Sequence, residues 1–407
     1  RRGAVRTPLQ AVALCPVAAA ILAFTAGIVT AATDPDWTGT APTNISGSPE
    51  IGILLHPAIA VGPSGPMVAA WNYSGLEERD DIYVTLSHDQ GSTWSTPVPA
   101  WDTDGFSQLP DAIIAQGTVY VAWTENESSE NTFTVYAGEL GSAPRAIPVP
   151  AADTPSNIPT RPRLAAGPDR LHVVFNAGAQ FELNGSHIFY SSLAPEHTTW
   201  TTATQVFAGT DVSWFPALAV APDGEALHVV WEEKKVLQEN RSVQYVRGTA
   251  SGSSVSWAPP TTLSVGVNSV KPDVAVSSGG DVHVIWGEVV KAGVDSEYYV
   301  SYRRYDSDSD SWLDAERVDA LPVYVNEATP TESPPRLALW EAGDQVHICV
   351  AWHGCRDSSQ CAEDALLSCS RDGGKTWRSV RTMSPCPEGI DEEADISIWP
   401  SVTFDTS

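Results

Sequence analysis

One pattern recurs along the whole chain and constrains its fold more than any other feature. A proline opens a short apolar segment, a turn follows, and a second apolar strand ends in an aromatic residue. The first segments read HPAIAV, LPDAIIA, RPRLAAG, FPALAV, KPDVAV, PPRLAL and WPSVTF, with prolines at 57, 110, 162, 216, 272, 335 and 400. The partner strands end at Trp71, Trp123, Phe175, Trp231, Trp286 and Trp352. Such a repeat predicts a modular fold whose units pack on their neighbours.

Each pair of segments is followed by a polar loop, a third alternating strand, and a fourth strand that begins near a tryptophan. Four strands in 52 to 65 residues is the size of a propeller blade. Turns such as GPSG, APDG and SSGG separate the first strand from the second. The sequence therefore predicts an all-β propeller of four-stranded antiparallel blades, with six complete blades and the start of a seventh.

The segment at Pro400 has no partner strand after it. Two interpretations stay open: a chain truncated within a seven-bladed propeller, or a strand at 400–405 that completes a sheet with residues from about 36 to 50. The corresponding domain prediction is a linker or closing strand at 33–50 and a propeller at 51–407.

The N-terminus carries a processing signal. Arg1, Arg2 and Arg6 precede an apolar run from Ala11 to Ala32, which is typical of a signal peptide. We expect residues 1–32 to be a signal peptide cleaved near its end, with a retained membrane anchor as the alternative. The protein is then extracellular or on the cell surface, and it meets a membrane only if that segment stays uncleaved.

The charge balance excludes several partners. The formal net charge is -27, and removal of the three N-terminal arginines leaves about -30. Nucleic acid needs a basic surface, so it is excluded as a partner. No EF-hand loop is present, and we expect no metal, no cofactor and a monomeric chain.

Five cysteines remain beyond the N-terminal segment, all between residues 349 and 386. Export permits disulfides. Cys355 and Cys361 are predicted to pair across one loop, because a five-residue spacer brings their Cα atoms within bonding range. Cys349 and Cys369 form a second candidate pair, which leaves Cys386 free.

Two copies of the repeat carry a sharper motif, SHDQGSTW at 87–94 and SRDGGKTW at 370–377. With this motif the chain resembles the Asp-box (BNR) repeat proteins of the sialidase-like superfamily. The resemblance implies structural turns on the face opposite the ligand site, and the similarity covers about residues 50–407. The turn residues are Ser87, Asp89, Gly91, Trp94, Ser370, Asp372, Gly374 and Trp377.

The resemblance also implies where a ligand would bind, at the loops that enter each first strand. The ligand-binding candidates are His56, Arg161, Arg163, Trp214, Lys271, Asp273 and Arg336. Asp111, Arg163, Asp273 and Arg336 follow their prolines and are predicted to meet around the central channel. A structural ring of ion pairs is the favoured interpretation there, and a ligand site is the alternative.

A sialidase of this superfamily needs three arginines for the substrate carboxylate, a tyrosine nucleophile with a glutamate, and an aspartate acid/base. Tyr324, Glu327 and Asp111 are the candidates for the last three roles. His56 stands where the resemblance places the first arginine, in LLHPAIA. We therefore favour a noncatalytic extracellular module that recognises a glycan or a protein, with an exo-sialidase or related glycoside hydrolase as the alternative.

Overall fold

The computed structural model describes residues 21–24, 45–46, 53–62, 65–74, 80–103, 105–127, 132–150, 159–178, 186–194, 198–209, 211–235, 240–264, 268–291, 296–325, 334–354, 364–383 and 401–404. The regular structure of these residues is all β-strand, as the repeat predicts. It follows that none of the described segments is a helix that could cross a membrane.

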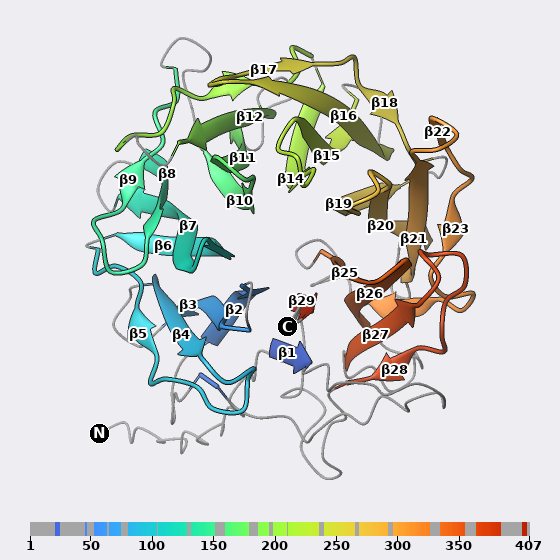
Figure 1. Ribbon diagram of the computed structural model, residues 1–407, viewed down its shortest axis with the longest axis horizontal. Coiled ribbons are helices and arrows are strands. Elements are labelled where there is room, and N and C mark those ends of the chain that lie inside the picture. The colour runs from blue at the N-terminus through green and yellow to red at the C-terminus, as the bar shows by residue number, and fades with distance from the viewer. Residues whose placement is uncertain are drawn as a thin grey trace, which may run out of the picture.

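Six antiparallel sheets form a ring around a central channel (Figure 1). The inner strands are β2 (Ile53–Val61), β6 (Phe106–Ala115), β10 (Thr160–Ala166), β14 (Val212–Val220), β19 (Ser269–Val276) and β25 (Arg336–Ala342). The second strands are β3 (Met67–Ser74), β7 (Thr118–Glu127), β11 (Leu171–Gly178), β15 (Ala226–Lys234), β20 (Val282–Lys291) and β26 (Gln345–Gly354). The prediction of six complete blades is confirmed.

The third strands are β4 (Asp80–Ser87), β8 (Thr132–Glu139), β12 (Ser186–Leu193), β16 (Arg241–Ser251), β21 (Ser296–Asp306) and β27 (Asp364–Ser370). The short outer strands are β5 (Val98–Pro99), β9 (Arg145–Ala146), β13 (Thr204–Gln205), β17 (Ser254–Trp257), β18 (Thr261–Thr262), β22 (Ser311–Trp312), β23 (Glu316–Arg317) and β28 (Arg381–Thr382). In the fifth blade a further strand, β24 (Val323–Val325), also pairs with β21.

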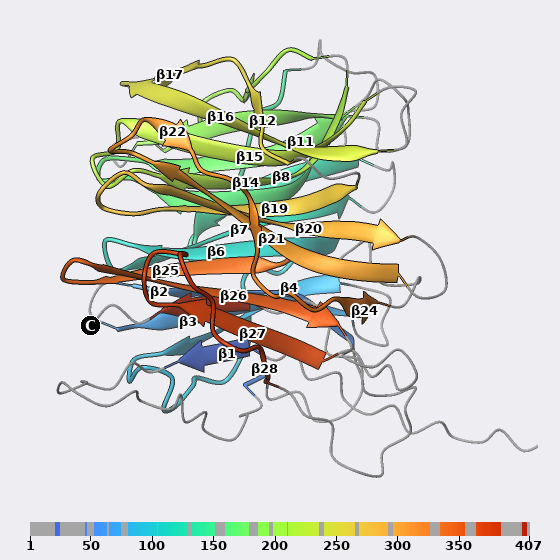
Figure 2. The same cartoon turned by 90° about the vertical axis from the view of Figure 1, so that its right-hand side faces the viewer.

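The strands run roughly along the axis of the ring (Figure 2). The turns between first and second strands and between third and fourth strands therefore gather on one face, which we call the hairpin face. The starts of the inner strands gather on the opposite face, which we call the mouth face.

The hydrophobic core lies between blades rather than within one blade. The blade 2–3 cluster, for example, joins Ala122 and Val135 to Val173, Phe175 and Phe189. Similar clusters join blades 1–2, 3–4, 4–5 and 5–6. Both faces of these sheets are covered, and this explains why the second strands read as nearly continuous apolar runs.

A repeated polar contact also joins neighbouring blades, and we call it the interblade triad. A histidine of the second strand bonds a tyrosine of the third strand, and the ring of that tyrosine meets a tryptophan of the next blade edge-on. The triads are His172–Tyr190–Trp257, His228–Tyr245–Trp312 and His283–Tyr302–Trp377, with Nδ1 to hydroxyl distances of 2.8, 2.9 and 2.7 Å.

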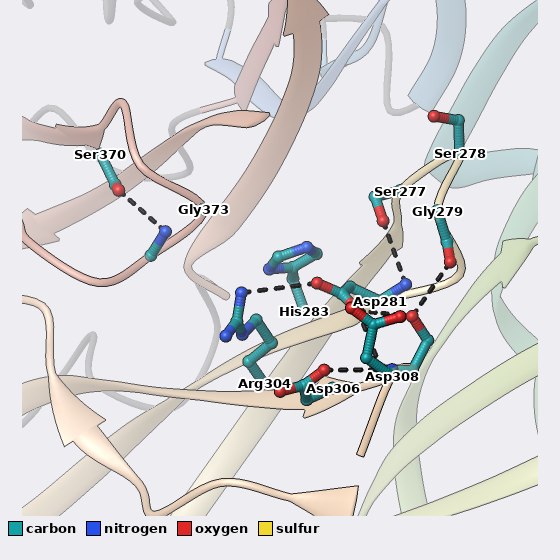
Figure 3. A network of polar contacts seen from close by, with 12 residues as sticks. Ser277, Ser278, Gly279, Asp281, His283, Arg304, Asp306, Asp308, Ser370 and Gly373 are labelled. Carbon is teal, nitrogen blue, oxygen red and sulfur yellow. Dashed lines mark hydrogen bonds and ion pairs between the residues drawn. The ribbon is translucent and has the colours of Figure 1, made fainter. Parts of the chain in front are cut away.

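The surroundings of one triad are visible from close by in Figure 3. His283 lies beside Asp281, whose carboxylate pairs with the Arg304 guanidinium at 3.4 Å and accepts hydrogen bonds from Ser307. Ser370 and Gly373, in the Asp box of the sixth blade, lie across from Arg304 (Figure 3). The Tyr302 hydroxyl donates to the Gly373 carbonyl at 3.1 Å, so a polar contact as well as the core holds the fifth and sixth blades together on the hairpin face.

The two Asp boxes form the same turn. In the second box, Asp372 accepts bonds from the backbone amide and the hydroxyl of Thr376, at 2.9 and 2.6 Å. The Ser370 hydroxyl accepts the Gly374 amide at 2.9 Å, and Gly374 has a φ of 85°, which disfavours any residue with a Cβ atom. Asp89 makes the matching bonds to Thr93. Both motifs lie on the hairpin face and serve the turn, so their carboxylates are not placed for catalysis.

A seventh inner position is occupied by a single strand, β29 (Ser401–Phe404). It contacts β25 on one side and β2 on the other, and it pairs in parallel with β1 (Ile21–Phe24). The sequence proposed residues from about 36 to 50 as the partner of this strand, whereas the observed partner is 21–24. Only Ile45 and Ser46 of the 36–50 segment belong to the described residues, and β1 falls inside the predicted export segment, which stays a prediction.

One disulfide joins the second and third strands of the sixth blade, between Cys349 and Cys369. These residues are direct partners across β26 and β27, so the predicted second pair is confirmed. A disulfide is typical of proteins in oxidising compartments. The predicted Cys355–Cys361 pair and Cys386 lie outside the described residues.

Candidate functional site at the mouth of the channel

The residue before the proline adopts the same unusual conformation in five blades. His56, Leu109, Arg161, Phe215 and Lys271 have φ values between 50° and 58°. Each lies at a shift in strand register, where two residues of the inner strand face one residue of the second strand, so that one extra residue bulges out. Such φ values cost roughly 1–3 kcal/mol in a residue other than glycine, and they concentrate at functional sites. The bulges bring one side chain from each blade to the mouth of the channel.

Four of these side chains, all but Lys271, help to enclose a small cavity, which we call the mouth cavity. Its volume is about 60 Å³, and its wall includes the repeat prolines of the first five blades and Pro334 of the sixth. The other lining residues are His56, Leu109, Arg161, Arg163, Phe215 and Arg336. Three predicted ligand-binding arginines, from the third and sixth blades, therefore share one cavity.

An ion-paired group crosses the channel directly beneath the mouth, and we call it the channel bridge. The Arg163 guanidinium lies 3.5 Å from Asp111 and 3.4 Å from Asp273, which come from blades 2 and 5. Asp111 also accepts the Leu164 amide of the next blade at 2.7 Å, and Asp273 accepts the Leu337 amide at 3.0 Å. The bridge links blades 2, 3, 5 and 6, and it joins by ion pairs three of the four residues predicted to meet around the channel; the fourth, Arg336, lines the mouth cavity.

Burial dominates the electrostatics of the channel bridge. It raises the pKa of both Asp111 and Asp273, although Arg163 and the backbone amides act in the opposite direction. Burial also opposes the charge of Arg163, but the two carboxylates outweigh it and raise the pKa of the guanidinium. Two carboxylates that share one guanidinium are poorly suited to act as a free general acid or base.

The wall between blades 3 and 5 is cationic and is built on one aromatic ring. The Arg161 guanidinium lies 4.3 Å from the centroid of Phe215, and the Lys271 ammonium lies 5.4 Å from it. Behind this wall Glu232 is fully buried; it pairs with Arg241 at 2.8 Å and accepts the Lys271 amide at 3.2 Å. The buried carboxylate holds the strained Lys271 backbone in place.

His56 supplies a neutral group to the cavity. Its Nδ1 lies 2.9 Å from the Asn72 amide oxygen. Burial lowers the pKa of His56 to about 4, although the Asn72 bond acts in the opposite direction. An uncharged imidazole therefore occupies the position where the resemblance implies an arginine.

The remaining predicted residues lie elsewhere or outside the described side chains. Trp214 is half-buried beside Arg241, 5.6 Å from its guanidinium, and does not line the mouth cavity. The side chain of Tyr324, in β24, and the whole of Glu327 lie outside the described residues.

Phe215, Leu109 and Glu232 were missed by the sequence. The signal for the first two was the position itself, since Leu109 and Phe215 stand directly before a repeat proline, as do His56 and Arg161, which line the same cavity. Nothing in the sequence identified Glu232, whose partner Lys271 comes from another blade.

No protein-family model and no curated protein sequence matches the chain. Among solved structures it is similar to an ulvan lyase of polysaccharide lyase family PL25, with 12% identity, 81% of this chain and 84% of that chain covered, and a TM-score of 0.55. A protein of unknown function from Dyadobacter fermentans matches with 13% identity, 75% and 92% coverage, and a TM-score of 0.51. A Hadza microbial sialidase matches with 13% identity, 87% and 64% coverage, and a TM-score of 0.46.

Identities this low describe the fold and not the activity. The six-bladed ring and the two Asp-box turns agree with the fold implied by the sequence. The chain thus has a six-bladed β-propeller fold.

Proposed function

We propose that this chain is a noncatalytic glycan-recognition module that binds the carboxylate of an acidic sugar at the mouth cavity. The observation that carries this hypothesis is the convergence of Arg161, Arg163 and Arg336 on one cavity. Guanidinium groups bind carboxylates through paired hydrogen bonds. A volume of about 60 Å³ suits a carboxylate, whereas a whole sugar needs several times more space. The sugar ring would lie above the mouth.

The surroundings of the cavity favour binding over hydrolysis. Asp111, the candidate acid/base, is held in the channel bridge by Arg163. His56 replaces an arginine of the clamp that the resemblance implies. Of the described residues that line the cavity, none is a tyrosine that could act as nucleophile.

A glycan fits this site better than a protein partner does. The similar ulvan lyase was solved bound to -[GlcA(1-4)Rha3S]-, which is an acidic glycan. A cavity that admits one small anionic group suits the exposed acid of a sugar better than a flat protein surface. The apolar N-terminal run and the Cys349–Cys369 disulfide further support an extracellular place of action.

Binding and turnover can be measured on the same preparation. We expect glucuronic acid and N-acetylneuraminic acid to bind the wild type in calorimetry, and glucose not to bind at this site. Arg161→Ala should weaken binding by roughly tenfold or more, because a charge-assisted bond contributes about 1.5–3 kcal/mol. Arg247→Ala removes an exposed arginine of β16 and should leave binding unchanged.

The hydrolase alternative is tested with an aryl sialoside. Enzymes turn over substrate at roughly 1–1,000 per second, and we expect no release of sialic acid on that scale. Robust turnover by the wild type that disappears in both Arg161→Ala and Tyr324→Phe would replace the recognition module with a glycoside hydrolase.

A further inference from the structure

The interblade triad occurs at three junctions of the ring and is absent from others, among them the junction of blades 2 and 3. At the junctions of blades 3–4, 4–5 and 5–6, the histidine and the tyrosine stand at fixed register positions. In blade 3, for example, Tyr190 pairs with Val174, and His172 lies two residues before Val174 on the same strand. In blade 2, Ala137 pairs with Ala122 and so occupies the tyrosine position. Tyr120, two residues before Ala122, occupies the histidine position. The large phenol that meets the next blade at those three junctions is therefore missing between blades 2 and 3.

The tryptophan of the next blade is still present at this junction. Trp200 is 4% exposed, whereas Trp257, Trp312 and Trp377 are half-buried. Its indole N–H donates to the Ala137 carbonyl at 3.3 Å. Trp200 thus sits against the backbone where its counterparts meet a tyrosine ring.

The missing phenol coincides with a pocket between blades 2 and 3, which we call the junction pocket. Its volume is about 290 Å³, and both Tyr120 and Ala137 line it. The hairpins around Gln116 and Ser142 form its rim, so it opens on the hairpin face. None of its lining residues lines the mouth cavity. The junction pocket is therefore a separate hollow at the opposite end of the ring.

The lining of the junction pocket combines an apolar floor with polar groups at the rim. Ala137, Leu171 and Leu193 are apolar, and Tyr120 presents a half-buried aromatic ring. Exposed Glu139 and Arg145 stand at the rim, and Arg170 is held by a bond of 3.1 Å to the Ser192 hydroxyl. Ligand pockets typically have this distribution, with about 300 Å³ near the lower end of their sizes.

We propose that the junction pocket is a second binding site, which holds one neutral pyranose unit of a glycan. A pyranose has a face of C–H groups that suits the Tyr120 ring and a rim of hydroxyls that both donate and accept hydrogen bonds. Arg145 and Arg170 can only donate, and the Glu139 carboxylate can only accept, so together they complement hydroxyls. The net charge of -27 disfavours an acidic sugar away from the mouth arginines.

The test uses the full chain and four neutral probes, the methyl pyranosides of glucose, galactose, mannose and N-acetylglucosamine. Saturation-transfer NMR should detect binding of at least one probe to the wild type. The double variant Tyr120→His/Ala137→Tyr rebuilds the interblade triad with Trp200 and fills the pocket. We expect it to weaken binding at least tenfold, with a melting temperature no lower than that of the wild type.

Arg161→Ala distinguishes binding in the junction pocket from binding in the mouth cavity. It alters only the mouth cavity and should leave the binding of neutral probes unchanged. If the double variant does not fold, Arg145→Ala replaces it, because that exposed residue can be removed without disturbing the core; a several-fold weakening is expected. The proposal is overturned if no probe binds the wild type, if the filled or Arg145 variant binds as well as the wild type, or if Arg161→Ala abolishes binding.

Discussion

Asp111 and Asp273 show how one residue type can serve two blades at once. Each follows its repeat proline, and each accepts the amide two residues after the proline of the next blade, at Leu164 and Leu337. The carboxylate of each aspartate also forms an ion pair with the Arg163 guanidinium. Burial raises the pKa of both carboxylates, so one guanidinium stabilises two charges only in part.

This balance predicts a contrast between two substitutions at one position. Asp273→Ala removes the acceptor of the Leu337 amide together with a charge partner of Arg163, and we expect a loss of about 3–5 kcal/mol in unfolding free energy. Asp273→Asn keeps an acceptor and relieves the excess negative charge, so a loss of about 1–2 kcal/mol or less is expected. Urea unfolding measures both values. Equal losses would show that the charge of Asp273, and not its hydrogen bond, stabilises the ring.

Among single elements, the second strands carry a pH-sensitive component of stability. Burial lowers the pKa of His172, His228 and His283 to about 4, against an ordinary value of 6.5. Each imidazole is neutral in the folded protein and bonds a tyrosine hydroxyl. The unfolded chain therefore binds more protons than the folded chain when the pH lies between about 4 and about 6.5.

We expect stability to fall as the pH drops from about 6.5 to about 4, because unfolding takes up protons in that range. Each histidine contributes up to about 3 kcal/mol to the fall. Buried carboxylates with raised pKa act in the opposite direction, so the comparison needs a variant. The triple variant His172→Gln/His228→Gln/His283→Gln should have a shallower slope of unfolding free energy against pH, whereas His88→Gln, at an exposed site, should keep the wild-type slope. An unchanged slope in the triple variant would contradict the interpretation.

The same strands show what the sequence could and could not predict. The spacing of prolines and tryptophans predicted the blades. Apolar and polar residues alternate within each strand, and this pattern can be recognised without knowing which strands pack beside it. The convergence of Arg161, Arg163 and Arg336 was predictable because the repeat fixes where each lies along its blade. The triads were not predictable, since LHVVF, LHVVW and VHVIW show a histidine but not the tryptophan that completes the contact from the next blade. The sequence favours Trp214 as the entry residue of its blade, whereas Phe215 is the residue that lines the mouth cavity.

At the scale of the whole molecule, the ring closes through a strand that belongs to none of the six sheets. β29 lies between the inner strands of blades 6 and 1. Val402 is 7% exposed and packs in a cluster with Ala338, Ala351 and Leu367 of the sixth blade. Closure of the ring therefore depends on a few apolar contacts of one short strand.

Val402→Asp tests this dependence. A carboxylate buried among these residues without a partner should cost about 3 kcal/mol or more and lower the melting temperature by several degrees. Thr403→Asp is the matched control: it places the same charge on a neighbouring side chain that is half-buried and lines the channel. Equal melting temperatures for the two variants would mean that β29 does not close the ring.

At the junction of blades 2 and 3, tyrosine and alanine replace the histidine and tyrosine of the interblade triad, and this difference has a consequence for engineering. Because pseudo-symmetry relates the junctions, two substitutions such as His172→Tyr and Tyr190→Ala would carve an equivalent hollow beside Trp257, one blade further round. The contacts on which the channel depends lie on the inner strands and would not be touched. The same pair of substitutions at further junctions would add more pockets of this kind on the hairpin face. Avidity, rather than tighter contacts in one pocket, would then set the strength of binding.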